Sequence, residues 1–119
     1  MTVIILPETL SYEDAVMIEP TTIAVQACSR AELVFEDNLM IIGAGALGSS
    51  ILRIARLYNP HKIIMVDIEE DKLKESLENG ATDIINSKVE DVVEKAHELT
   101  DGYGPTVVID AAWFSWQVF

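Results

Sequence analysis

The sequence predicts an α/β fold with a doubly wound parallel sheet that is truncated after its fourth strand and preceded by two helices. Two observations support this prediction. From residue 39 onward, strand-like apolar runs alternate with helix-like segments, as in parallel sheets with crossover helices. A Gly-x-Gly-x-x-Gly sequence spans residues 43–48, where the first strand would turn into a helix. Right-handed crossovers between these units give the strand order 3-2-1-4.

Capping signals predict the two leading helices. Ser11 begins a Ser-x-x-Asp sequence and caps a short helix that we expect to run through Glu19. Pro20 suits the first residue of a second helix, because its missing N–H would have no intrahelical acceptor there. This helix is expected to run to about Glu32. Residues 1–37 are therefore predicted as a leading segment with linker helices.

A strand and a helix flank the glycines. Residues 39–42 form a continuous apolar run, as in a strand buried on both faces, and follow a polar turn at residues 36–38. Asn59-Pro60 stops the helix behind the glycines. The apolar residues at helical spacing are Ile51, Ile54, Ala55 and Tyr58.

The same alternation continues toward the C-terminus. Residues 62–66 predict a second strand, residues 70–78 a helix and residues 83–86 a third strand. Ser87 and Glu90 form a predicted capping box that starts the next helix.

This last helix is predicted to end at the breaker sequence of residues 101–105, and residues 106–109 form the fourth strand. The apolar face of this predicted helix consists of Val89, Val92, Val93, Ala96 and Leu99.

The glycine motif carries the functional prediction. Gly43 would permit the tight turn, Gly45 the approach of the backbone to a pyrophosphate, and Gly48 the close packing of helix on strand. Asp67 follows the motif by about 20 residues, the spacing at which a carboxylate accepts hydrogen bonds from the adenosine ribose. Because Asp67 would repel the 2′-phosphate of NADP, residues 38–112 are predicted to be a partial NAD-binding Rossmann domain.

A second interpretation needs no ligand: the three glycines form an ordinary tight turn, and Asp67 caps the following helix. An ordinary loop rarely combines the preceding strand, the following helix and the acidic residue, so the dinucleotide site is favoured.

Charge and cysteine content exclude several classes of function. The chain of 119 residues has a net charge of −12, which disfavours nucleic acid and anionic membranes as partners. Its single cysteine, Cys28, excludes an internal disulfide and suits a reducing, cytoplasmic location. Cys28 lies in an apolar helical stretch and is predicted to be a buried structural thiol. The isolated His61 and His97 lack metal-ligand spacing and are predicted at the surface.

With these motifs in place, the chain resembles the cofactor-binding domain of the zinc-dependent medium-chain alcohol dehydrogenases, with the polyol (sorbitol-type) branch most similar. The resemblance runs from about Leu6 to Ala112. It rests on Leu6-Pro7-Glu8-Thr9-Leu10-Ser11, Met17-Ile18-Glu19-Pro20, Gly43 to Gly48, Val66-Asp67, Asn79-Gly80-Ala81-Thr82 and Val107-Val108-Ile109-Asp110.

The resemblance implies roles for particular residues. Backbone amides around Ala46, Leu47 and Gly48 would hold the pyrophosphate, and Asp67 the adenosine ribose. Lys72 would assist Asp67, although it equally fits a solvated helix lysine. Leu47 stands where the family packs an aliphatic side chain behind the nicotinamide.

The resemblance also implies zinc, which we expect in a full-length enzyme and not on this chain. Glu19 occupies the position of a glutamate at or near the family's catalytic zinc, and otherwise simply ends a helix before Pro20. The family's other zinc ligands and proton relay come from a domain that would precede Met1. The isolated chain is therefore expected to bind NAD without catalysing alcohol or polyol oxidation; the alternatives are a non-catalytic adenine-nucleotide-binding module or an inactive truncated assembly fragment.

The C-terminus departs from the family pattern. Residues 113–119 are an atypical aromatic tail, and Trp113 would crowd the cofactor where the family has a glycine. A fourth strand without a neighbour and an apolar tail would leave an open edge, so we expect self-association, as a homodimer.

Overall fold

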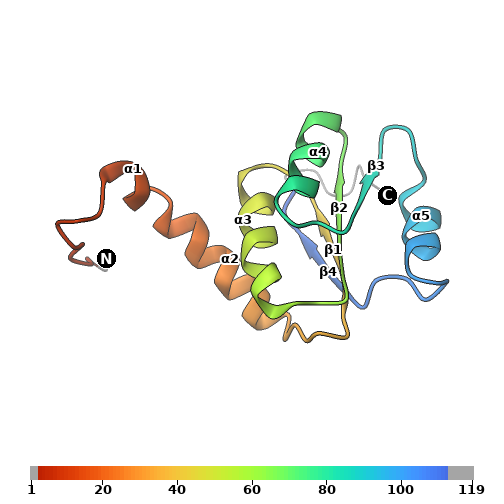
Figure 1. The fold of residues 1–119 in the computed structure, drawn as a ribbon, viewed down its shortest axis with the longest axis horizontal. Helices are drawn as coiled ribbons and strands as arrows, with labels where there is room; N and C mark the ends of the chain where they lie inside the picture. The colour runs from red at the N-terminus through yellow and green to blue at the C-terminus, as the bar shows by residue number, and fades with distance from the viewer. Residues whose placement is uncertain (1–2, 113–119) are drawn as a thin grey trace.

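The computed structural model describes residues 3–112 and contains one parallel sheet with the predicted strand order β3-β2-β1-β4. Figure 1 shows this sheet in the larger part of the molecule, with the N-terminal residues projecting from it. The strands are β1 (Asn38–Ile42), β2 (Lys62–Asp67), β3 (Asp83–Asn86) and β4 (Val107–Asp110). All three strand pairings are parallel, which confirms the α/β fold and the crossover connections.

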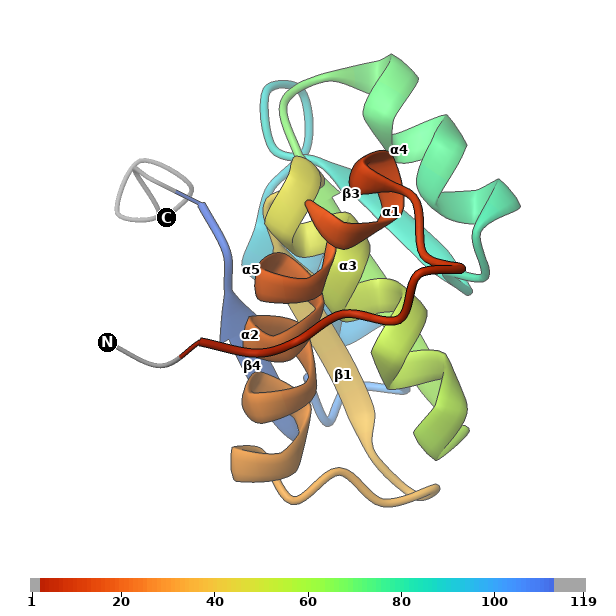
Figure 2. The same ribbon diagram turned by 90° about the vertical axis from the view of Figure 1, so that its left-hand side faces the viewer.

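Helices cover both faces of the sheet. The helices are α1 (Tyr12–Ala15), α2 (Ile18–Arg30), α3 (Ala46–Ala55), the 3-10 helix η1 (Arg56–Tyr58), α4 (Glu70–Glu78) and α5 (Val92–Leu99). Buried side chains of α2, α3 and α4 form one apolar cluster with the sheet, and those of α5 form a second cluster. The two views in Figures 1 and 2 place α5 on the side of the sheet opposite α3.

Strand β1 joins the two clusters because its side chains alternate between the faces. Leu39 and Ile41 lie in the cluster with α2 and α3, whereas Met40 and Ile42 lie in the cluster with α5. Burying each of these side chains stabilises the fold by about 1.5–3 kcal/mol. The continuous apolar run that predicted this strand thus reflects burial on both faces.

The boundaries of the two leading helices differ from the prediction. Ser11 does cap α1, since its Oγ accepts a hydrogen bond from the backbone N–H of Asp14, 3.1 Å away. However, α1 ends at Ala15, and Glu19 and Pro20 are the second and third residues of α2. Proline is tolerated there because N–H groups of the whole first turn lack intrahelical acceptors, so Pro20 did not fix the first residue.

The start of α5 also differs from the prediction. Asp91, and not Ser87, is the N-cap, and its Oδ1 accepts from the backbone N–H of Glu94 at 3.0 Å. The side chain of Glu90 reaches back to accept from the backbone N–H of Asn86 at 2.9 Å, so the predicted capping box is wrong. Val89 consequently lies in a loop and is 76% exposed.

The residues before α2 form an N-terminal arm, defined here as residues 3–17. The arm contains α1 and leads into α2, whose buried residues are Ala24, at the middle of the helix, and Cys28, near its C-terminal end. In Figure 1 the arm extends away from the sheet. Within residues 3–112, no helix has the length and apolar character needed to cross a membrane.

Candidate functional site

The glycine loop, residues 43–48, connects the carboxyl end of β1 to α3. Gly43 has φ +99° and donates its N–H to the backbone oxygen of Val66 at 2.7 Å, which joins the loop to β2. A Cβ at Gly43 would lie 3.1 Å from the backbone carbon of Ala111, on the segment that follows β4. The left-handed backbone and this close approach both require glycine.

Gly48 and Gly45 differ in what surrounds them. A Cβ on Gly48 would overlap the backbone oxygen of Gly43, so the missing side chain is what lets α3 pack this closely on the loop. A Cβ on Gly45 would meet no atom of the described chain within 4 Å. Gly45 therefore borders open space, where a ligand could approach the backbone.

The first turn of α3 provides hydrogen-bond donors beside this space. Gly45 is the N-cap, with an extended backbone and no side-chain cap, and its backbone oxygen accepts from the N–H of Ser49 at 2.9 Å. The amides of Ala46, Leu47 and Gly48 precede this first helical hydrogen bond, so they have no intrahelical acceptor. Free amides and the positive end of the helix dipole favour an anion such as a pyrophosphate.

Asp67 ends β2 beside the glycine loop and holds the loop in place. Its Oδ2 accepts from the backbone N–H of Ala44 at 2.7 Å, while Oδ1 accepts from Ile68 and Glu69 at 2.7 and 2.9 Å. This bracing role was missed by the sequence analysis, because nothing in the spacing shows that Ala44 would lie beside the carboxylate. The alternative interpretation, in which Asp67 caps the following helix, is wrong on that point, since the N-cap of α4 is Glu69.

Two other residues with predicted roles lie outside this hydrogen-bond network. The Nζ of Lys72 is 3.3 Å from Oε1 of Glu69, in an ion pair whose side chains are largely solvent-exposed. Glu19 lies exposed in the first turn of α2. Within residues 3–112, no group of three His, Cys, Asp or Glu side chains could hold a metal ion. The roles of Lys72 at the ribose and of Glu19 at zinc stay predictions.

Leu47 and the C-terminal tail are the two features that were predicted to contact or crowd the cofactor near its nicotinamide end. Leu47 is half-buried and packs against the cluster formed by α2, α3 and α4. Trp113 and the rest of the tail, residues 113–119, lie outside the described residues. The predicted crowding of a cofactor by Trp113 is therefore untested.

Cys28 is a buried thiol between α2 and α3, as predicted. Its Sγ lies 3.9 Å from the backbone oxygen of Ile51, and burial raises the pKa of the thiol above its ordinary value of 9.0. A raised pKa reduces the fraction of reactive thiolate, which fits a structural role. His61 and His97 are exposed, also as predicted.

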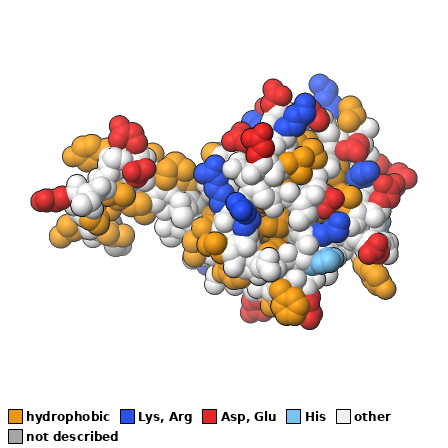
Figure 3. All heavy atoms as spheres, in the orientation of Figure 1, with side chains coloured by type: hydrophobic (Ala, Val, Ile, Leu, Met, Phe, Trp, Pro, Cys, Tyr) orange, Lys and Arg blue, Asp and Glu red, His pale blue; other side chains and the backbone are white. Residues whose placement is uncertain are grey.

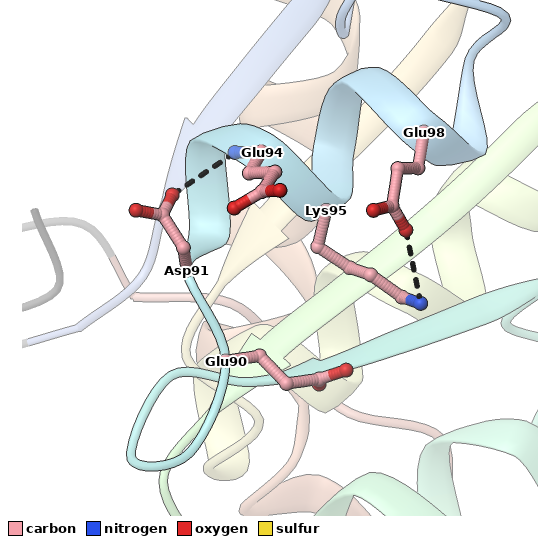
Figure 4. Close-up of a pocket in the computed structure, with 5 residues that line it drawn as sticks. All are labelled: Glu90, Asp91, Glu94, Lys95 and Glu98. Atoms are coloured by element: carbon pink, nitrogen blue, oxygen red, sulfur yellow. Dashed lines mark hydrogen bonds and ion pairs between the residues drawn. The ribbon is translucent and has the colours of Figure 1, made fainter.

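A second concave feature lies beside α5, and no residue of the glycine loop lines it (Figure 4). It is an open pocket of about 230 Å³, and Figure 4 shows the ion pair of Lys95 with Glu98 and the cap of Asp91 within it. Its lining comprises Glu90, Asp91, Glu94, Lys95 and Glu98. Four carboxylates around one ammonium group would repel a pyrophosphate, so the glycine loop remains the candidate dinucleotide site.

Comparison with known proteins agrees with this geometry. The model of the zinc-binding dehydrogenase family matches residues 46–113, more than half of the chain. Sorbitol dehydrogenase from Arabidopsis thaliana is 33% identical over 114 residues, which cover 92% of this chain and 31% of that protein. Sorbitol dehydrogenase from Bacillus subtilis is 32% identical over 111 residues, 93% of this chain and 30% of that protein.

Solved structures of related enzymes share the fold. Alcohol dehydrogenase from Thermus sp. ATN1 aligns with a TM-score of 0.82 and 28% identity, covering 90% of this chain and 31% of the enzyme. The alcohol dehydrogenase rspB from E. coli CFT073 was solved with its cofactor NADH. It aligns with a TM-score of 0.76 and 32% identity, covering 90% of this chain and 32% of that protein. The chain thus spans about a third of the length of the relatives it matches. On this evidence the chain belongs to the zinc-binding dehydrogenase family.

Proposed function

We propose that the chain binds NAD(H) at the glycine loop, as the dinucleotide-binding part of an alcohol or polyol dehydrogenase. The pyrophosphate would accept hydrogen bonds from the amides of Ala46, Leu47 and Gly48. The open space at Gly45 is the observation that carries the proposal, because it leaves these donors accessible. The related E. coli protein solved with NADH supports the choice of ligand.

Asp67 would select NAD(H) over NADP(H). Its carboxylate accepts three backbone N–H bonds, and a carboxylate has about four lone-pair sites, so one remains for a ribose hydroxyl. The negative charge would repel a 2′-phosphate at the same place. Lys72, whose ammonium group pairs with Glu69 at the N-cap of the same helix, would assist Asp67 at the ribose.

Turnover is proposed for the complete enzyme and not for this chain alone. NAD supplies hydride-transfer chemistry, and a zinc ion, with Glu19 at or near it, would bind the alcohol or polyol. Because the chain spans about a third of its relatives, we propose that the isolated chain binds the dinucleotide without catalysing the reaction. We place this function in the cytoplasm, in keeping with the single buried thiol.

Calorimetry on the purified chain tests the proposal directly, with NADH, NADPH and ADP-ribose as titrants. NADH and ADP-ribose are expected to bind, and NADPH to bind at least tenfold more weakly. The matched variant is Gly45→Ala, whose added Cβ would meet no atom of residues 3–112 but would fill the space that the pyrophosphate needs. The Gly45→Ala variant should unfold at the same temperature as the unmodified chain, and it should no longer bind NADH or ADP-ribose.

Two results separate the alternatives. Equal binding of all nucleotides with an adenine moiety would indicate a general adenine-nucleotide module and overturn the selective role of Asp67. Absence of binding by a folded chain would overturn the dinucleotide site and leave the assembly fragment as the remaining interpretation.

We also propose that the chain self-associates, as a homodimer. Large apolar side chains are exposed on the N-terminal arm, including Ile5 at 94% and Val16 at 72%. β4 lies at the edge of the described sheet. Exposed apolar surface and an open strand edge both favour association with another chain.

A further inference from the structure

Ala44, between the first two glycines of the loop, is held at both of its backbone polar groups by side chains. Its N–H donates to Oδ2 of Asp67 at 2.7 Å, and its carbonyl oxygen accepts from Oγ of Ser49 at 3.3 Å. Asp67 ends β2, and Ser49 is the fourth residue of α3. The buried Ala44 therefore links the sheet to the helix at the point where the chain turns.

The bond from Ser49 fixes the orientation of the peptide unit between Ala44 and Gly45. A trans peptide unit is planar, so its carbonyl and its N–H point in opposite directions. Directing the oxygen of Ala44 at Ser49 therefore directs the N–H of Gly45 away from Ser49. No backbone oxygen of residues 3–112 accepts from this N–H, so the peptide unit is oriented from its carbonyl side, by Ser49.

Gly45 makes this peptide unit easy to reverse. Reversal changes ψ of the residue before the unit and φ of the residue after it, and Gly45 has φ −74°. Glycine adopts positive φ about as readily as negative φ, because it has no Cβ. The surroundings of Gly45 are also open, since a Cβ there would meet no atom of residues 3–112 within 4 Å. Ser49 supplies the restraint that Gly45 lacks.

The orientation of the peptide unit matters because the ligand is an anion and the protein is acidic. The net charge is −12, and Figure 3 shows Asp and Glu side chains distributed over the sheet-containing part of the molecule. Binding of a pyrophosphate then depends on the backbone N–H groups at the start of α3. A reversed peptide unit would turn the partial negative charge of the Ala44 oxygen away from Ser49, toward the space that Gly45 borders.

We propose that Ser49 is a positioning residue for the dinucleotide, whose hydroxyl keeps the carbonyl oxygen of Ala44 turned away from a bound pyrophosphate. This role rests on the dinucleotide binding proposed above. Ser49 acts through Ala44 and needs no contact with the ligand. If its loss lowers the fraction of chains in the binding orientation to about one tenth, the apparent Kd rises about tenfold.

The neighbouring serine provides a matched control. Oγ of Ser50 donates to the carbonyl oxygen of Ala46 at 2.9 Å, a bond inside α3. Replacing either serine by alanine changes helix propensity equally. In calorimetric titrations with NADH and ADP-ribose, Ser49→Ala should bind both about tenfold more weakly than the unmodified chain, and Ser50→Ala should bind them equally well. Ser49→Thr keeps a hydroxyl donor and should recover most of the affinity.

The backbone amide of Gly45 reports the orientation of the peptide unit without any ligand. In NMR relaxation-dispersion measurements on the ligand-free chain, this amide should show exchange on the microsecond-to-millisecond timescale in Ser49→Ala. It should show no such exchange in Ser50→Ala or in Ser49→Thr. A general loosening of the fold would instead produce exchange at amides throughout the sheet.

The outcomes separate this inference from the proposal on which it rests. Absence of NADH binding by the folded, unmodified chain would overturn the dinucleotide site and with it the role of Ser49. Binding by the unmodified chain, with equal affinities in Ser49→Ala and Ser50→Ala, would overturn the positioning role alone. Weaker binding by Ser49→Ala without exchange at Gly45 would also overturn it, because the peptide unit would then be held without the hydroxyl.

Discussion

The glycine loop and the N-terminal arm are held in place by different kinds of contact. The loop is bonded to residues distant in sequence, since Gly43 donates to Val66 and Ala44 donates to Asp67. In the arm, the hydrogen bonds are local, such as those from Leu10 to Pro7 and from Asp14 to Ser11. Substitutions in the loop should therefore affect global stability, and substitutions in the arm should affect association.

Gly48→Ala should give the largest effect. Its Cβ would overlap the backbone oxygen of Gly43, and backbone atoms cannot move aside as a flexible side chain can. We expect the free energy of unfolding to fall by about 3 kcal/mol, more than the roughly 1 kcal/mol that alanine gains over glycine in a helix. Urea unfolding measures the change. Gly45→Ala should stay within about 0.5 kcal/mol of the unmodified chain, and equal losses would contradict the distinction between the two glycines.

Asp67→Ala should have the next largest effect. Removing the carboxylate leaves the N–H of Ala44 without its acceptor at a partly buried position, so we expect about 2 kcal/mol of lost stability. Urea unfolding in the absence of nucleotide isolates this structural role from ligand binding. Asp67→Asn keeps an amide oxygen as acceptor and should recover part of the loss. Unchanged stability in Asp67→Ala would show that Asp67 serves the ligand alone.

The sequence predicted the elements best where distant contacts and local pattern agree. Runs such as residues 39–42 identified strands because they are buried on both faces, and the glycine spacing located the turn because backbone overlap excludes other residues there. Strand order then followed from the handedness of the crossovers. The backbone contacts that close the loop against the sheet, at Val66 and Ala111, could not be read from such a pattern.

Errors arose where several nearby residues could perform the same local role. Asp91 and Ser87 are both competent N-caps, and packing of Val92 and Ala96 against the sheet selects Asp91. Pro20 is compatible with each position of a first helical turn, so it could not locate the start of α2. The contact between Asp67 and Ala44 was not predictable, because it depends on how far β1 and β2 extend beside each other.

Cys28 gives a stability effect that depends on pH. Burial raises its pKa in the folded chain, so above the ordinary value of 9.0 the unfolded chain loses the proton first. The unfolded state then binds fewer protons, and the free energy of unfolding should fall as the pH rises above about 9, by at most about 1.4 kcal/mol per pH unit. Urea unfolding of the unmodified chain and of Cys28→Ala between pH 7 and about 10.5 isolates the thiol from other titrating groups. Parallel pH profiles would contradict this role.

The smallest effects should come from substitutions at two N-cap residues, Ser11 and Asp91. Because Ser11 lies in the N-terminal arm and Asp91 caps a helix packed on the sheet, the pair allows a direct comparison of the two regions. Asp91→Ala removes the cap of α5, a helix that buries Val92 and Ala96, and should cost about 1 kcal/mol. Ser11→Ala removes an equivalent cap from α1, which buries no residue, and should change global unfolding by less than about 0.5 kcal/mol. Urea unfolding at low chain concentration, where the monomer predominates, measures both. A cost at Ser11 equal to that at Asp91 would show that the arm folds against the sheet domain, because a local helix that contacts nothing cannot contribute to cooperative unfolding.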